Sequence, residues 1–192
     1  MNLHRVLVRT YGYALLAVLA VAVPATAENN LTAKLANIRI ENFGRVNDNY
    51  YRGAQPKDRD YADLAALGVK TVIDLRNDGR SDERGLVERA GMRFQRIPMS
   101  SSERPSDAAV AQFLKLVNDP ANQPVFVHCH GGRHRTGAMT AVYRMTQEGW
   151  TAERAYQEMK RYKFETLLGH PKLKRFVYDY YAGIGHAQAV AK

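Results

Sequence analysis

Three apolar, β-branched segments alternate with amphipathic helical patterns along this chain. The segments Lys70–Arg76, Arg93–Met99 and Gln123–Cys129 each run into turn-forming residues. Between the last two, apolar residues recur at helical spacing from Ser106 or Asp107 onward. Such alternation predicts an α/β fold, with a central, mostly parallel sheet flanked by helices. Ligands of such folds bind beyond the carboxyl ends of the strands.

The same spacing predicts further helices on either side of these segments. They cover Tyr61 to Leu67 with an end at Gly68, Thr136 into Gly149, a segment starting at Thr151, and a last one carrying Leu173 to Tyr180. We expect a loose stretch ahead of Tyr50. The sequence contains no internal repeat.

The N-terminus has the pattern of a secretory signal. Two arginines precede the apolar run ALLAVLAVAVP, and the small-residue exit ATA precedes Glu28. We therefore expect a signal peptide over residues 1–27, cleavage after Ala27, and a periplasmic or otherwise exported protein whose N-terminal residue is Glu28. The apolar run is short for a membrane span, so no stable span is expected after cleavage. An uncleaved N-terminal anchor is the alternative.

Residues 28–192 are long enough for one domain, with a core over about 45–182. The full chain has a net charge of +9, and removal of the two leader arginines leaves +7. This excess favours anionic partners such as phosphorylated ligands. No basic run is interleaved with aromatic residues, so nucleic acid is not expected as a partner.

Cys129 is the only cysteine of the chain and lies in the stretch VFVHCHGGRHRTG. It cannot form an internal disulfide, so in an oxidising compartment it is a free thiol. A buried structural thiol is one interpretation. The other follows from the loop, whose two glycines and following helix would turn backbone N–H groups toward an anion. Arg135 and the helix N-terminus would then lower the pKa of Cys129 and make it a nucleophile aimed at phosphorus.

Arg135 stands six residues after Cys129 and can offer two parallel hydrogen bonds to phosphate oxygens, which lysine cannot. The Thr136 hydroxyl can donate to the sulfur, stabilise the thiolate and help it leave; a plain helix N-cap is the alternative. His128 is interpreted as a hydrogen-bonded structural histidine. Asp74 is expected to organise neighbouring loops.

We predict neither a metal site nor a cofactor. The three histidines around Cys129 are close in sequence, but no carboxylate ligands accompany them, and thiolate chemistry on phosphate needs no ion.

The string HCHGGRHRTG resembles the H-C-x5-R-[ST] signature of the cysteine-dependent phosphatases, the superfamily of protein tyrosine and dual-specificity phosphatases. YRGAQP, VKTVIDLR and YRMTQEGWTAERAYQEMKRY are similar to the compact bacterial, plant and fungal dual-specificity branch, and the motifs together cover Tyr50 to Tyr162. The resemblance implies a dual-specificity phosphatase-like fold, Cys129 as the nucleophile that forms a phosphocysteine, and Arg135 as the phosphate clamp. It implies that substrate phosphate binds to the loop residues His130, Gly131, Gly132, Arg133 and His134.

The resemblance also implies a general acid, usually an aspartate, on the loop after the strand that ends near Pro98. That loop reads MSSSERPSD here and has no aspartate before Asp107. We predict Glu103 as the acid, with Asp107 as the alternative. Asp107 falls in the first turn of a helix, where the dipole stabilises its anion and makes it a poorer proton donor.

These features predict an exported phosphatase of phosphotyrosine, and also of phosphoserine and phosphothreonine, in proteins. The basic residues Arg133 and His134 favour an alternative, a phosphatase of inositol phosphates or phosphoinositides. A rhodanese-like sulfurtransferase is a third candidate, although its loop is usually shorter. A non-catalytic phosphate-binding protein would explain the missing aspartate but not the intact Cys129 and Arg135.

Overall fold

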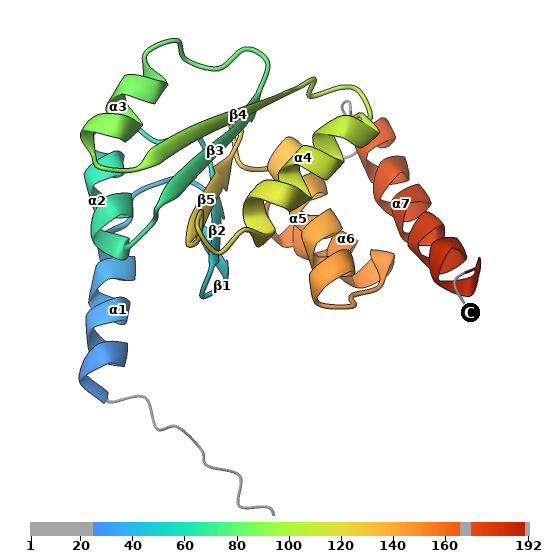
Figure 1. Cartoon of the computed structure of the whole chain (residues 1–192), viewed down its shortest axis with the longest axis horizontal. Helices are drawn as coiled ribbons and strands as arrows, with labels where there is room; N and C mark the ends of the chain where they lie inside the picture. The colour runs from blue at the N-terminus through green and yellow to red at the C-terminus, as the bar shows by residue number, and fades with distance from the viewer. Residues whose placement is uncertain (1–24, 166–169, 191–192) are drawn as a thin grey trace, which may run out of the picture.

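The computed structural model describes residues 25–165 and 170–190. Five strands form one sheet in the order β1-β2-β5-β3-β4 (Figure 1). The strands are β1 (Gly44–Asn47), β2 (Tyr50–Gly53), β3 (Thr71–Arg76), β4 (Arg93–Met99) and β5 (Val125–His128). Only the β1–β2 pair is antiparallel among these four pairings, and the other three are parallel. The predicted α/β fold with a mostly parallel sheet is confirmed.

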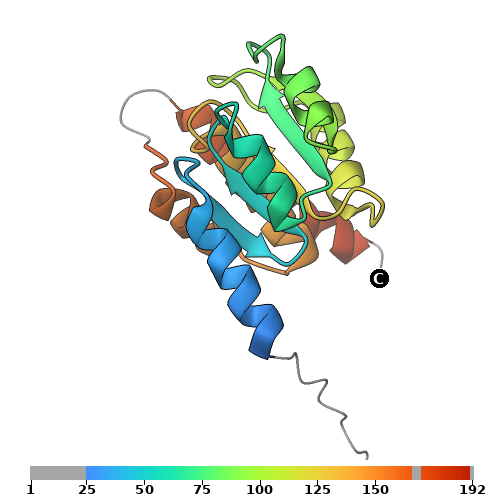
Figure 2. The ribbon, with the colours of Figure 1, turned by 90° about the vertical axis from the view of Figure 1, so that its left-hand side faces the viewer.

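Helices cover both faces of the sheet (Figures 1 and 2). One face carries α1 (Ala25–Asn37), α2 (Asp60–Leu67) and α3 (Glu83–Arg89); the other carries α4 (Asp107–Asn118), α5 (Arg135–Gln147), α6 (Ala152–Arg161) and α7 (Pro171–Val190). Alternate side chains of a strand point to opposite faces. Val125 and Val127 of β5 therefore join the core under α4 to α7, whereas Phe126 joins the core under α1 to α3.

The predicted helix ends depend on local hydrogen bonds. The Ser106 hydroxyl accepts a hydrogen bond from the N–H of Ala109 at 3.2 Å and caps α4. Thr151 caps α6 by accepting from the N–H of Arg154 at 3.3 Å. Gly68 ends α2 with φ of 96°, in the left-handed region. These three boundaries follow the sequence prediction.

The expectation of a loose stretch ahead of Tyr50 is wrong. α1 and β1 precede this residue, and β1 forms a hairpin with β2. All four residues of β2 are buried, because β5 lies beside it, with Tyr50 opposite Val125. Two four-residue strands are too short to show a period of their own, so pairing with a distant segment decides their structure.

The predicted signal peptide lies mostly outside the described residues. α1 begins at Ala25, so the expected cleavage position after Ala27 falls in its first turn. Signal cleavage and export stay predictions. Within the described ranges, no helix combines the length and apolar character needed to cross a bilayer.

Candidate active site

The predicted nucleophile lies where the central strands of the sheet end. β5 runs parallel to β2 on one side and to β3 on the other. Its last residue, His128, therefore brings the chain to the sheet edge at which ligands of such folds bind. The loop from Cys129 to His134 leads directly into α5, which begins at Arg135. The strand, loop and helix expected around Cys129 are all present.

Neighbouring segments bind the carbonyl oxygens of this loop from behind. The His130 carbonyl accepts a hydrogen bond from the N–H of Gln55 at 3.0 Å. The Gly132 carbonyl accepts from Arg52 Nη2 at 2.7 Å and from Asn42 Nδ2 at 3.0 Å. A trans peptide holds its carbonyl and the following N–H on opposite sides. The N–H groups that follow these carbonyls therefore point away from the backing residues.

Gly132 allows the loop to lie directly on the end of β2. Its φ is +64°, in the left-handed region that favours glycine. A Cβ at this position would stand 2.4 Å from the carbonyl carbon and oxygen of Gly53. The shape of the loop thus depends on a backbone contact that leaves no room for a side chain.

A cavity of about 390 Å³ opens above the loop. It is lined by Glu41, Ser101, Cys129, His130, Gly131, Arg133, His134, Arg135 and His170. Four of the five loop residues predicted to bind phosphate are in this lining, and the fifth, Gly132, is buried beneath them. The structure therefore brings the predicted nucleophile, clamp and phosphate-binding loop together around one cavity.

The environment of Cys129 favours its thiolate. Burial opposes the charged form, since the residue is only 3% exposed. The hydroxyl and the backbone N–H of Thr136, together with the charges of Arg135 and His128, outweigh burial and hold the pKa of Cys129 below its ordinary value. Thr136 is the second residue of α5 and His134 is the residue before the helix, so the N-cap interpretation of Thr136 is wrong.

Arg135 is anchored through one of its nitrogens. Nη1 donates to the Met99 carbonyl at 3.0 Å and lies 3.3 Å from Asp78 Oδ1. Nε has no hydrogen-bond partner among the described residues. One edge of the guanidinium is thus held by protein, and a buried donor is left for a phosphate oxygen. A hydrogen bond from Arg76 keeps the pKa of Asp78 at about 2, so Asp78 is an anion that orients Arg135 and not a proton donor.

The rim of the cavity contains residues that the sequence did not point to. Arg133 Nη2 lies 3.0 Å from Glu41 Oε1, so a carboxylate from the segment before β1 offsets its charge. The His134 ring stacks on His170, with centroids 3.6 Å apart. Burial, with His170 as a neighbour, lowers the pKa of His134 to about 4, so this ring is neutral near pH 7. No sequence motif marks Glu41 or His170, because both reach the rim from distant segments.

Neither predicted acid lines the cavity in the described part of the chain. Glu103 is exposed, and its carboxylate oxygens lie 2.7 and 2.8 Å from Lys172 Nζ on α7. Asp107, in the first turn of α4, accepts a hydrogen bond from Arg104 at 2.7 Å. Ser101, on the loop between β4 and α4 that also carries Glu103, does line the cavity. Glu103 is therefore only two residues along the chain from a residue of the cavity wall.

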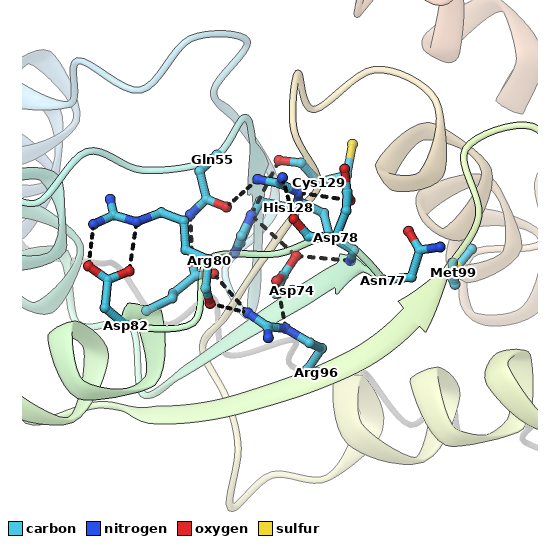
Figure 3. Close-up of polar contacts among 12 residues, drawn as sticks. Gln55, Asp74, Asn77, Asp78, Arg80, Asp82, Arg96, Met99, His128 and Cys129 are labelled. Carbon is cyan, nitrogen blue, oxygen red and sulfur yellow. Dashed lines mark hydrogen bonds and ion pairs between the residues drawn. The ribbon is translucent and has the colours of Figure 1, made fainter.

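Asp74 and His128 lie beneath the loop and not in the cavity. Both are fully buried. Asp74 sits within β3, between His128 and Arg96 (Figure 3), and accepts hydrogen bonds from the N–H of Arg76 and from Arg96 Nε, each at 2.9 Å. Asp74 thus fixes the start of the loop after β3, in which Asp78 contacts Arg135. This agrees with the predicted role of Asp74 in organising neighbouring loops.

Most of the chain matches a known protein family. A family described as "DSP-PTPase phosphatase fused to NAD+ Kinase" matches residues 33–172, more than half of the chain. The chain belongs to the DSP-PTPase phosphatase family. The resemblance expected from the loop motif is confirmed, and a sulfurtransferase assignment has no support.

Two DSP-PTPase relatives have different named substrates. The dual specificity protein phosphatase TpbA of Pseudomonas aeruginosa is 34% identical over 121 residues, which cover 62% of this chain and 54% of TpbA. The inositol diphosphatase SIW14 of Saccharomyces cerevisiae is 28% identical over 130 residues, which cover 65% of this chain and 46% of SIW14. The chain thus spans about half the length of either relative.

A solved structure of P. aeruginosa TpbA, a cysteine-to-serine variant in complex with pTyr, is similar to this DSP-PTPase chain with a TM-score of 0.63. The two chains are 27% identical, and the similarity covers 75% of this chain and 90% of that chain.

The contact between Gly132 and Gly53 predicts the effect of a single methyl group. Gly132→Ala should lose about 10²-fold in turnover of an aryl phosphate, because the loop must move by about 1 Å to relieve the clash. Gly149→Ala is the matched control, since Gly149 has φ of +65° but nothing within 4 Å of the added Cβ. Gly149→Ala should lose about 1 kcal/mol of stability in thermal unfolding, from its left-handed φ alone, and Gly132→Ala should lose more, because the clash adds to the same strain. Equal activity of the two variants would contradict the role assigned to the contact.

Proposed function

We propose that the protein is a phosphatase that hydrolyses phosphomonoesters through a phosphocysteine intermediate on Cys129. One observation carries the proposal: a buried thiol with a lowered pKa lies in a cavity together with an anchored arginine, on a loop whose carbonyl groups are bound from behind. A thiolate held in this way is a nucleophile directed at a bound phosphate.

The reaction has two displacements at phosphorus. Cys129 Sγ attacks the phosphorus while the bond to the leaving oxygen breaks, and an acid gives that oxygen its proton. Water then attacks the phosphorus and gives a proton back to the acid's conjugate base, the sulfur–phosphorus bond breaks, and the thiolate leaves with inorganic phosphate as the product. Arg135 stabilises the charge on the equatorial oxygens in both steps. Thr136 donates to the departing sulfur in the second step.

Loss of the thiol should separate binding from turnover. Cys129→Ser should abolish turnover of an aryl phosphate while leaving binding of a phosphate analogue largely intact, because serine is not ionised at neutral pH. As Cys129 is the only cysteine, peroxide should inactivate the wild type and thiol reductant should restore it. Retention of more than about a hundredth of wild-type turnover by the variant would overturn the covalent mechanism. A wild type that binds phosphate but turns nothing over would support the non-catalytic alternative.

We propose phosphotyrosine in proteins as the main substrate, with phosphoserine and phosphothreonine as further ones. Support comes from the 34% identity to a relative named a dual specificity protein phosphatase. The contact between Glu41 and Arg133 adds to it, because the carboxylate offsets a positive charge that a polyanionic substrate would need. Inositol phosphates are the second candidate, favoured by the relative named an inositol diphosphatase and by the basic loop.

The two substrate classes should respond differently to the charge at Arg133. The wild type should have a higher kcat/KM for a phosphotyrosine peptide than for an inositol polyphosphate. Arg133→Ala should spare the peptide and lower kcat/KM for the polyphosphate by about tenfold, the worth of one charge-assisted hydrogen bond. Glu41→Gln is the opposing control and should favour the polyphosphate. A wild-type preference for the inositol substrate would reverse the assignment.

We propose Glu103 as the general acid, acting after its carboxylate leaves Lys172. It is supported by its place on the loop whose Ser101 lines the cavity, and by its exposure. Glu103→Gln should slow hydrolysis of an alkyl phosphate by about 10²- to 10⁴-fold and largely spare an activated aryl phosphate. Asp107→Asn should change neither. If Asp107→Asn alone shows this dependence on the leaving group, the acid is Asp107; if neither does, the proton comes from elsewhere.

A further inference from the structure

A second cavity, of about 560 Å³, adjoins the cavity that contains Cys129. Glu41 and His130 line both cavities, and both residues are exposed. The second one, called the side cavity below, is also lined by Arg39, Ile40, Lys57 and Arg80. A substrate whose phosphate lies at Cys129 can therefore extend past His130 into the side cavity.

Backbone hydrogen bonds fix the wall of the side cavity. The N–H of Ala54 donates to the Glu41 carbonyl at 2.9 Å, so the segment before β1 lies beside the one after β2. In the turn before α2, Asp60 Oδ2 accepts a hydrogen bond from the N–H of Lys57 at 2.7 Å, and the N–H of Asp60 donates to the Lys57 carbonyl at 2.9 Å. The backbone that carries Lys57 is thus held in place before any ligand binds.

The two exposed carboxylates of the side cavity already have cationic partners. Glu41 Oε1 lies 3.0 Å from Arg133 Nη2 and 3.5 Å from Lys163 Nζ. Asp58 Oδ1, also in the lining, lies 2.8 Å from Arg80 Nη1. Their negative charges are therefore offset without the help of the other cations of the side cavity.

Two basic side chains of the side cavity have no such partners. Arg80 is engaged twice, because it also lies 2.7 Å from Asp82. Arg39 and Lys57 are exposed, and neither forms an ion pair or a side-chain hydrogen bond within residues 25–165 and 170–190. A guanidinium and an ammonium without partners in one cavity favour an anionic group there.

We propose that the side cavity is a substrate subsite, in which Arg39 and Lys57 bind the carboxylate of an acidic residue near the phosphotyrosine of a protein substrate. The inference rests on the proposed function and deepens it by naming the sequence around the phosphorylated residue. An extended peptide advances about 3.3 Å per residue, so residues a few positions from phosphotyrosine can reach the side cavity.

The charge of the side cavity favours a carboxylate over a second phosphate. A phosphate monoester carries a charge of about −1.5 to −2 near pH 7, whereas a carboxylate carries −1. Glu41 and Asp58 lie in the same lining and repel the more highly charged group more strongly. The two cations Arg39 and Lys57 are thus better matched to the side chain of glutamate or aspartate.

Two phosphotyrosine peptides of equal length test this specificity. One has glutamate at the three positions on either side of phosphotyrosine, and the other has glutamine there. The wild type should have a kcat/KM about tenfold higher for the glutamate peptide, the combined effect of two surface ion pairs. The difference should lie in KM, because contacts remote from the phosphorus act equally on bound substrate and transition state. Arg39→Gln combined with Lys57→Gln should reduce the ratio of the two kcat/KM values to about 1.

The matched control removes the same charge elsewhere. Lys70→Gln combined with Lys115→Gln changes two exposed residues that line neither cavity, and should keep most of the wild-type preference. An equal loss of preference in both double variants would assign the effect to net charge and overturn the proposal. The absence of any preference in the wild type, or its persistence in the Arg39 and Lys57 variant, would do the same.

Binding measurements separate the subsite from the proposed reaction. In a Cys129→Ser background, fluorescence anisotropy should show tighter binding of the glutamate peptide, and the Arg39 and Lys57 substitutions should remove the difference. If this holds but the wild type hydrolyses neither peptide, the proposed function fails and the subsite stands. If the wild type hydrolyses both peptides equally well, the function stands and the subsite is wrong. If the substitutions weaken binding of an inositol polyphosphate and not of the glutamate peptide, the side cavity binds a second phosphate and the proposal is overturned.

Discussion

An anion-binding loop has to turn its N–H groups inward, which leaves its carbonyl groups to be satisfied from outside. In this protein, Arg52, Asn42 and the backbone N–H of Gln55 donate hydrogen bonds to those carbonyl groups from behind the loop. Arg52 is fully buried and stacks on Tyr162, 3.9 Å from the ring centroid. A buried guanidinium is costly unless it is paired with an acceptor. Its hydrogen bond to the Gly132 carbonyl supplies that acceptor and fixes the loop against β2.

The same loop is bordered by two sets of charges with different tasks. Above it, Arg135 is held by the Met99 carbonyl and Asp78, so a cation is in place before any substrate arrives. Such preorganisation is the main way in which a site stabilises charge that develops during a reaction. Below it, the buried side chains of Asp74, Glu83 and His128 lie together, and the partly exposed Arg96 contacts both carboxylates. The loop is therefore fixed on both sides by polar contacts.

The links between these layers come from residues at the ends of elements. Arg76, the last residue of β3, donates its backbone N–H to Asp74 below and its side chain to Asp78, which orients Arg135. It also donates to Gln55, which binds Glu83 and the loop backbone. The two layers are thus joined by hydrogen-bonded groups that lie outside the cavity.

The sequence alone determined the fold class, the helix caps and the chemical core of the site. Ser106, Thr151 and Gly68 act through hydrogen bonds to near neighbours, and Cys129, Arg135 and Thr136 lie within one short loop and helix start. Interactions of that range can be predicted from spacing. Tertiary structure decided the rest: the pairing that makes β1 and β2 strands, the backing of the loop by Asn42 and Arg52, the partners of Arg133 and His134, and the contact of Glu103 with Lys172. These depend on segments brought together by packing of the two cores, and no local pattern encodes which distant residue will arrive beside a given side chain.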